Sequence, residues 1–320
     1  PLRRQRQMCI RDRRFAVGAF NANNMEMVQA IIETAHEERA SVILQVSQGA
    51  IRYAGLDYAV GLVKIAAAQV DVPVVLHLDH GTSYEQNVLC LRAGFTSLMF
   101  DGSKLPYEEN IAITRKVCEI AHIAGIPVEA ELGRVLQSTD GVTLEEVEAA
   151  MTDPDQAREF VVRTGADSLA VAVGSVHAMK SREADLDISR IEAIRQKLAL
   201  SRSPERSEGI AEGIGVPLVL HGSSGVRHES VVEAIEHGIC KVNVATYLNQ
   251  AFVHGMREGF EKHPDEVDPR KYLSIARENV KEAVREKIRL FKSNDRIDSS
   301  GGFKSPPRQY RSVDLGGSEE

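Results

Sequence analysis

Several features of membrane, secreted or nucleic-acid-binding proteins are missing from this 320-residue sequence. Its four cysteines, Cys9, Cys90, Cys118 and Cys240, are far apart and form no Cys-x-x-Cys pair. A disulfide framework and a cysteine zinc site are therefore not expected, and reduced thiols fit a cytoplasmic protein. No apolar run approaches the roughly 20 residues that span a bilayer, so no membrane span is expected. The net charge of -7, with both signs interspersed, offers no basic surface for nucleic acid or anionic lipid.

A glycine-rich dinucleotide fingerprint is also missing, since no Gly-x-Gly-x-x-Gly follows the first predicted strand. What the sequence does contain is an alternation of short β-branched runs with amphipathic stretches, which is typical of repeated βα units. Eight such runs predict a (β/α)8 TIM barrel, with an open doubly wound sheet as the alternative. The predicted strands are 15–22, 41–47, 72–80, 97–102, 127–132, 168–174, 217–222 and 241–246.

Three segments do not follow this alternation. Residues 1–14 are basic with little apolar content, and we interpret them as a disordered or non-native tail. Residues 201–213 are polar and turn-forming, which indicates a surface insertion in a barrel spanning 15–292. Residues 293–320 are predicted to be a disordered C-terminal tail. Just before them, residues 268–291 have helical periodicity and predict an extra helix packed across one end of the barrel.

Polar side chains end nearly every predicted strand, where the active site of such a barrel lies. His80, His177 and His221 come from three different strand ends. Three neutral imidazoles around an open fourth position are typical of a catalytic zinc site. Further strand-end polar residues are Asn21, Asn23, Gln45, Ser47, Asp79, Asp101, Glu129, Glu131 and Asn243.

The stretch "VPVVLHLDHGTS", residues 72–83, ends a buried strand in ionisable groups. Such groups are costly to bury unless they are paired or bind a metal. Because neighbouring residues on a straight strand point to opposite faces, Asp79 and His80 can share one site only if the chain turns there. Gly81 follows at that point. His77 shares a side with Asp79 and is expected to support the site.

Two loops have the composition of anion sites. "HGSSG", residues 221–225, leaves a strand and leads into a helix beginning near Arg227, so its backbone N–H groups and hydroxyls can surround a phosphate. "NVATY", residues 243–247, ends the next strand and can do the same. Phosphate sites recur at these two loops in TIM barrels, so we predict a small phosphorylated ligand.

The sequence resembles the class II, metal-dependent fructose-bisphosphate aldolases, which include the tagatose-bisphosphate aldolases. The matching motifs, found between residues 15 and 291, are "AVGAFNANNMEM", "LHLDHG", "VEAELG", "GSVHAMK", "LVLHGSSG" and "KVNVATYLN". The resemblance implies a cytoplasmic, glycolytic lyase that uses Zn2+ to cleave a ketose 1,6-bisphosphate, with fructose 1,6-bisphosphate as the expected substrate. It also implies a homodimer or homotetramer.

The resemblance further implies a role for each matching residue. His80, His177 and His221 would hold the zinc, and Asp79 would be the acid/base group. Asp101 and Glu131 would be auxiliary ligands when the zinc shifts or a second divalent or monovalent cation binds. Ser47 would contact the aldehyde half of the substrate. The remaining substrate contacts, with Asn243 also steadying the enediolate, would come from Ala178, Gly222, Ser223, Ser224, Asn243, Val244, Ala245 and Thr246.

Departures from the family pattern keep other functions open. Ala178 stands where many members have glycine, and the loop 133–141 has Asp140 as its only acid. A catalytically impaired sugar-phosphate-binding homologue is therefore an alternative. A tagatose-bisphosphate aldolase is another, because the two ketose bisphosphates differ only at C4, and a metal-dependent hydrolase on the same barrel, in which Asp79 activates water, is a third. A Schiff-base mechanism has no lysine to use, because Lys241 is predicted at the wrong end of its strand.

Overall fold

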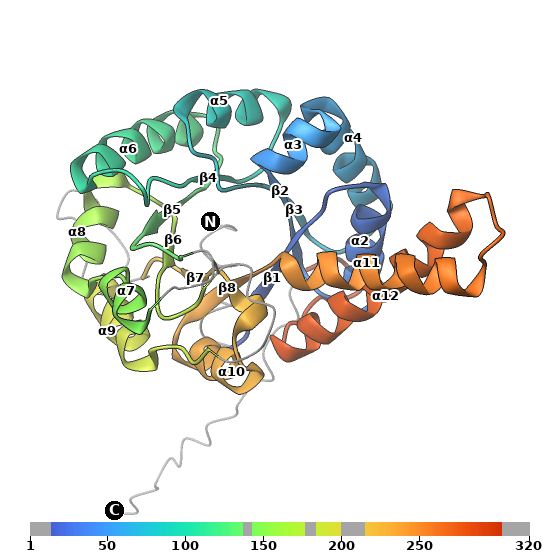
Figure 1. The fold of residues 1–320 in the computed structure, drawn as a ribbon. Helices are drawn as coiled ribbons and strands as arrows, with labels where there is room; N and C mark the ends of the chain where they lie inside the picture. The colour runs from blue at the N-terminus through green and yellow to red at the C-terminus, as the bar shows by residue number, and fades with distance from the viewer. Residues whose placement is uncertain (1–13, 137–142, 177–183, 200–214, 303–320) are drawn as a thin grey trace, which may run out of the picture.

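The computed structural model describes residues 14–136, 143–176, 184–199 and 215–302. Its strands form one parallel sheet in the order β3-β2-β1-β8-β7-β6-β5-β4, surrounded by helices (Figure 1). Each predicted strand run contains one strand or most of one. The strands are β1 Val17–Asn21, β2 Val42–Ser47, β3 Val74–Asp79, β4 Leu98–Phe100, β5 Val128–Leu132, β6 Ser168–Val171, β7 Leu218–Leu220 and β8 Ile239–Val244.

Short contacts between β3 and β4 bring the two edges of this sheet together. Isolated parallel bridges join His77 to Ser97 and Gly81 to Phe100. The backbone N–H of Asp101 also donates to the carbonyl of Gly81 at 2.8 Å. The eight strands therefore make a nearly closed barrel, and the prediction of a TIM barrel is confirmed.

The helices begin and end where the local sequence favours it. The side chain of Asn24 accepts a hydrogen bond from the backbone N–H of Met27 and so caps α2. Gly94 ends α5 in the left-handed conformation, with φ of 95°, which costs glycine little. The helices are α2 Met25–Glu37, α3 Gln48–Ala54, α4 Leu56–Ala67, α5 Tyr84–Ala93, α6 Tyr107–Ile123, α7 Leu144–Ala149, α8 Pro154–Thr164, α9 Ile188–Ala199, α10 His228–His237, α11 Thr246–Lys262 and α12 Pro269–Leu290, with a 3-10 turn η2 Ser223–Gly225.

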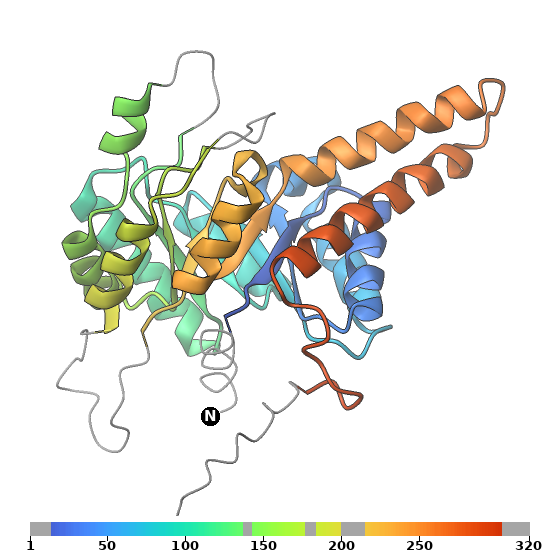
Figure 2. The same ribbon diagram turned by 90° about the horizontal axis from the view of Figure 1, so that it is seen from below.

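The extra C-terminal helix is present, but it does not lie across an end of the barrel. α11 and α12 form an antiparallel hairpin that projects outward, and α12 runs along α2 on the outside (Figures 1 and 2). Glycines allow the close approach, since a Cβ on Gly255 would lie 2.6 Å from the Cα of Ala276. Ion pairs of Glu37 with Lys281 and Arg285 join α2 to α12. The apolar face of α12 thus packs mainly against the neighbouring helices α11 and α2 rather than across the ends of the strands.

The predicted C-terminal tail needs a partial correction. Residues 293–302 pack on the barrel, because the backbone N–H of Asp295 donates to the carbonyl of Glu38 and Ile297 is only 1% exposed. One apolar side chain and a few backbone hydrogen bonds are enough to fix this segment. The predicted N-terminal tail up to residue 13, the insertion 201–213 and residues 303–320 lie outside the described residues. In the described ranges, no helix is long and apolar enough to cross a membrane.

Candidate active site

The turn expected after Asp79 is present at His80. His80 has a φ of 50°, in the left-handed region that non-glycine residues rarely adopt. Gly81 makes this turn possible, because a Cβ there would lie 2.6 Å from the carbonyl oxygen of Met99. The backbone therefore leaves β3 close against β4, and the side chains of Asp79 and His80 can face the same space.

His80, Glu131 and His221 come together at the carboxyl ends of β3, β5 and β7. One ligand atom from each lies within 4.8 Å of the others, the arrangement needed to share a metal ion. Nδ1 of His221 is 3.2 Å from Oε2 of Glu131. The two imidazole rings are 4.8 Å apart and meet edge to face. Two predicted zinc ligands and one of the two predicted auxiliary ligands are thus neighbours, whereas His177 and Ala178 lie outside the described residues.

Asp101 holds the ring of His80. Its Oδ2 lies 2.7 Å from Nδ1 of His80, and its Oδ1 accepts hydrogen bonds from the backbone N–H and the hydroxyl of Ser103. A carboxylate fixed in this way sets the orientation and the tautomer of the imidazole. Asp101 therefore lies beside the cluster and is hydrogen-bonded to His80.

The charges around the cluster favour a cation. Burial lowers the pKa of His80, but the carboxylates of Asp79, Asp101 and Glu131 more than compensate and raise it to about 10. Burial likewise lowers the pKa of His221, and the carboxylates of Glu129 and Glu131 raise it overall. The same carboxylates that favour protonation of His80 and His221 would also favour a bound metal cation.

The cluster fits a divalent ion such as zinc. Oε2 of Glu131 is buried and, among the described residues, has no hydrogen bond of normal geometry. A buried carboxylate oxygen without a hydrogen bond is costly unless a positive charge lies beside it, and a metal ion bound between Glu131 and His221 would supply that charge. Imidazole nitrogen and carboxylate oxygen are also the donor atoms that zinc takes in catalytic sites.

Asp79 is held by a chain of amides. Its Oδ2 accepts a hydrogen bond from Nδ2 of Asn21 at 2.7 Å, and Oδ1 of Asn21 accepts one from Nε2 of Gln45 at 2.9 Å. Burial raises the pKa of Asp79, but His80, His221 and the bond from Asn21 lower it overall. Asp79 is therefore ionised at neutral pH and can accept a proton. In the sequence, the one signal for a role of Asn21 and Gln45 was that both lie at the ends of predicted strands.

A pocket of about 350 Å³ opens above these groups. Six of the predicted substrate contacts line it, and so do Asp79, His80, Asp101 and Glu131. The six are Gly222, Ser223, Ser224, Asn243, Ala245 and Thr246. The loops after β7 and β8 therefore face the possible metal ligands across one cavity.

These two loops are shaped for an anion. The hydroxyl of Ser223 donates to the carbonyl of Asn243 at 2.5 Å, which ties the loops together. Gly222 has a φ of 67° and packs against the backbone of Val176. Ala245 provides no side-chain cap for α11, and the hydroxyl of Ser224 accepts a hydrogen bond from the backbone N–H of Tyr247 at 3.3 Å. The loop after β7 therefore lies at the N-terminus of α11, where an anion is favoured.

Two predicted contacts are not brought into the pocket. The hydroxyl of Ser47 caps α3 by accepting from the backbone N–H of Ala50, and Val244 is fully buried in β8. Their contacts with substrate stay predictions. Two cations that are not among the predicted site residues, Lys104 and Arg134, also line the pocket, and no ion pair of either with a described residue is found.

Comparison with known proteins gives the family. A family profile described as "Fructose-bisphosphate aldolase class-II" matches residues 8–296, most of the chain. The chain belongs to this family. It is therefore a lyase, a class II aldolase, as the motifs in the sequence indicated.

Individual relatives agree with this placement. The aldolase is 43% identical over 288 residues to a "Probable fructose-bisphosphate aldolase" of Bacillus subtilis, an alignment covering 89% of this chain and 95% of the relative. It is 41% identical to a fructose-bisphosphate aldolase of Thermus caldophilus, over 87% and 93% of the two chains. The crystal structure of the YdjI aldolase of Escherichia coli K12 superposes with a TM-score of 0.76 at 33% identity, covering 91% and 97%.

Proposed function

We propose that this aldolase reversibly cleaves fructose 1,6-bisphosphate into dihydroxyacetone phosphate and glyceraldehyde 3-phosphate with the help of Zn2+. The observation that carries the proposal is one pocket that combines three features. These are a buried, ionised Asp79, the cluster of His80, Glu131 and His221, and the anion-binding loops after β7 and β8. The names of the relatives support a fructose bisphosphate as the substrate.

His80, His221 and His177 would hold the zinc, with Glu131 as an auxiliary ligand. A divalent ion there would act as a Lewis acid on the carbonyl of the substrate. Asp101 fixes the ring of His80 through its hydrogen bond, and could join Glu131 around a second cation. The excess of carboxylates near the two imidazoles supports the binding of positive charge at this place.

Asp79 would move the proton. Cleavage of the bond between C3 and C4 requires removal of the proton from the C4 hydroxyl, and condensation returns it. The bond from Asn21 holds one carboxylate oxygen of Asp79 still. The other oxygen lies 3.5 Å from Nδ2 of Asn243, so the carboxylate is directed between β3 and β8, where the substrate chain would lie.

The phosphates would bind at the rim of the pocket. The dihydroxyacetone phosphate half would contact the loops of Gly222–Ser224 and Asn243–Thr246, with Ala178 nearby. Oδ1 of Asn243 is buried with no hydrogen bond among the described residues, so it is available to a substrate hydroxyl. Lys104 and Arg134 add positive charge to a site that takes anions. Ser47 would contact the aldehyde half.

Condensation of the two triose phosphates, followed by identification of the product, tests this proposal. Fructose 1,6-bisphosphate as the main product is the expected result. The tagatose epimer would contradict the substrate. Zinc-loaded protein that binds dihydroxyacetone phosphate without exchanging its proton with solvent would instead identify a silent binding protein. Hydrolysis without release of a triose phosphate would favour the hydrolase alternative.

We further propose a cytoplasmic homodimer or homotetramer. Exposed apolar side chains on the hairpin of α11 and α12, Val253, Phe260 and Val267, support contact with a second copy. Analytical ultracentrifugation of the purified protein distinguishes these states from a monomer. A monomeric protein would contradict the proposed assembly but not the proposed activity.

A further inference from the structure

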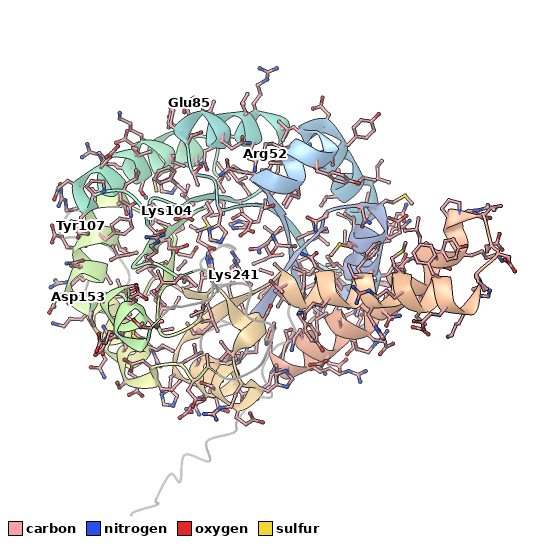
Figure 3. All side chains as sticks on the ribbon, viewed as in Figure 1. Arg52, Glu85, Lys104, Tyr107, Asp153 and Lys241 are labelled. Carbon is pink, nitrogen blue, oxygen red and sulfur yellow. The ribbon has the colours of Figure 1, made fainter. Side chains whose placement is uncertain are left out.

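A layer of buried ionisable residues lies inside the barrel, below the active site. His77, Glu129 and Lys241 are 1%, 2% and 7% exposed. Each precedes a residue of the site by two positions on the same strand: Asp79, Glu131 and Asn243. Because strand side chains repeat with a period of two, each points inward one layer further down. Figure 3 shows Lys241 near the centre of the ring of strands.

This position corrects the expectation for Lys241. The lysine is not at the far end of its strand and away from the chemistry, since β8 begins at Ile239 and Lys241 reaches into the interior. Its ammonium group is engaged by Glu129, so it gives no Schiff-base nucleophile. Burying a charged lysine is costly because the ammonium group is removed from water, so Lys241 needs a compensating interaction or role.

Hydrogen bonds connect this layer to the metal cluster. Nζ of Lys241 lies 2.6 Å from Oε2 of Glu129 and 3.2 Å from Nε2 of His77. Nδ1 of His77 is in turn 2.8 Å from the hydroxyl of Ser97. The second oxygen of Glu129, Oε1, is 2.9 Å from Nε2 of His221. One carboxylate therefore bridges the lysine and a residue of the metal cluster.

The donor and acceptor roles follow from the ammonium group, which can only donate. Nε2 of His77 must accept from Lys241, so the ring carries its proton on Nδ1. The ring is neutral, because burial and the charge of Lys241 lower its pKa to about 3. Oε1 of Glu129, the oxygen not used by Lys241, accepts from Nε2 of His221. Nδ1 of His221 then faces Oε2 of Glu131 as a potential metal ligand.

We propose that Lys241 is a positioning residue for the metal site. By neutralising Glu129 and occupying one of its oxygens, Lys241 keeps the other oxygen on Nε2 of His221 and so presents Nδ1 of that ring to the metal. The proposal uses the proposed function only for the presence of a metal in this cluster, and it concerns metal binding rather than turnover.

Three variants test the proposal: Lys241→Met, Glu129→Gln and the double variant. Zinc affinity by competition with a chelator, and the visible spectrum of the Co2+ form, are measured without substrate. Lys241→Met leaves a buried carboxylate without its cation and is expected to weaken zinc binding by about 10- to 100-fold, the usual effect of losing such a partner. The Co2+ spectrum should change as well.

The double variant distinguishes positioning from a merely structural role. In Glu129→Gln, Lys241 attracts the amide oxygen and turns the NH2 group toward His221, which favours the wrong tautomer. With Lys241→Met added, the amide oxygen is free to accept from Nε2 of His221. The double variant should therefore bind zinc about tenfold more tightly than Glu129→Gln, recovering affinity through a second loss of charge.

Lys281→Met on α12 is the control, since this lysine forms ion pairs away from the pocket. It should keep the wild-type zinc affinity and Co2+ spectrum. The proposal is overturned if Lys241→Met folds and binds zinc like the wild type, or if the double variant binds no more tightly than Glu129→Gln. If Lys241→Met does not fold, the comparison of the double variant with Glu129→Gln still tests the proposal. Wild-type protein that binds zinc without cleaving sugar phosphates contradicts only the proposed function, whereas failure to bind zinc contradicts both.

Discussion

Asp79 and His80 are neighbours in the chain and have different surroundings. Asp79 ends β3 and is held by Asn21, whereas His80 lies in the left-handed turn and is held by Asp101. One residue can therefore carry a proton while the next holds a cation, because their partners come from different strands. Substitutions at this point should separate the two roles.

Replacing the carboxylate of Asp79 should remove catalysis but keep the metal. We expect Asp79→Asn to lower kcat for fructose 1,6-bisphosphate cleavage by about 10²- to 10⁴-fold, the usual contribution of a general base. Zinc content, measured by atomic absorption, should be unchanged. Asp57→Asn, on the first turn of α4, is the control and should keep full activity. Near-normal turnover of Asp79→Asn would show that another group moves the proton.

Gly81 should not tolerate a side chain. A Cβ there would lie 2.6 Å from the backbone oxygen of Met99 and 2.7 Å from the side chain of Leu78. We expect Gly81→Ala to lower the free energy of unfolding in urea by about 1–3 kcal/mol, as overpacking does. It should also weaken zinc binding by displacing His80.

Gly61 provides the matched control for this substitution. It lies within α4, and a Cβ there has nothing within 4 Å. Gly61→Ala should be stabilising by about 0.5–1 kcal/mol, because alanine loses less entropy than glycine in a helix. If both substitutions had the same effect, close packing at Gly81 would not be the cause.

At the scale of elements, ionic contacts attach α12 to α2. The hydrogen bond from Lys281, opposed by partial burial and supported by Arg285, lowers the pKa of Glu37 below its ordinary value of 4.5. A carboxyl group whose pKa is lower in the folded state stabilises the fold above the unfolded pKa. This contribution is lost as the pH falls through the folded value.

Glu37→Gln should therefore destabilise the protein near neutral pH, by about 0.5–1 kcal/mol because the pair is partly exposed to water. Well below pH 4.5 the variant and the wild type should unfold alike, because the carboxyl group is then protonated in both states. Urea unfolding at the two pH values measures the difference. Glu119→Gln on α6, whose partner Arg115 is 3.8 Å away and exposed, should have little effect at either. A pH-independent effect of Glu37→Gln would exclude the ionic contribution.

At the scale of the whole molecule, the proposed metal site joins β3, β5 and β7, and a bound ion should add to global stability. A ligand that binds only the folded state stabilises it by about 2.7 kcal/mol at a hundred times its Kd. Zinc should therefore raise the Tm, and a chelator should reverse the rise. His221→Ala should abolish the rise. His122→Ala, which removes a histidine paired with Asp167 at the surface, should keep it. A zinc-dependent rise of equal size in His221→Ala would place the metal elsewhere.

The sequence by itself determined the barrel, the strand ends and the chemical character of the site. The alternation of strand and helix patterns depends on residues close together in the chain, so it can be recognised from the sequence alone. The motifs around Asp79, His221 and Asn243 are likewise contiguous stretches of sequence. Polar residues at strand ends also predicted where the pocket would lie, because parallel strands direct all their carboxyl ends to one side.

Only the tertiary structure decided which distant residues meet. The partnership of Glu129 with His221 and Lys241 spans three strands, and no local pattern encodes which inward-facing residues share a layer. The same holds for α12, whose apolar face specifies burial but not the neighbour that provides it, and for residues 293–302, where a single buried Ile297 outweighs a polar composition. Closure of the barrel sets these contacts, since it fixes the depth at which each side chain enters the interior.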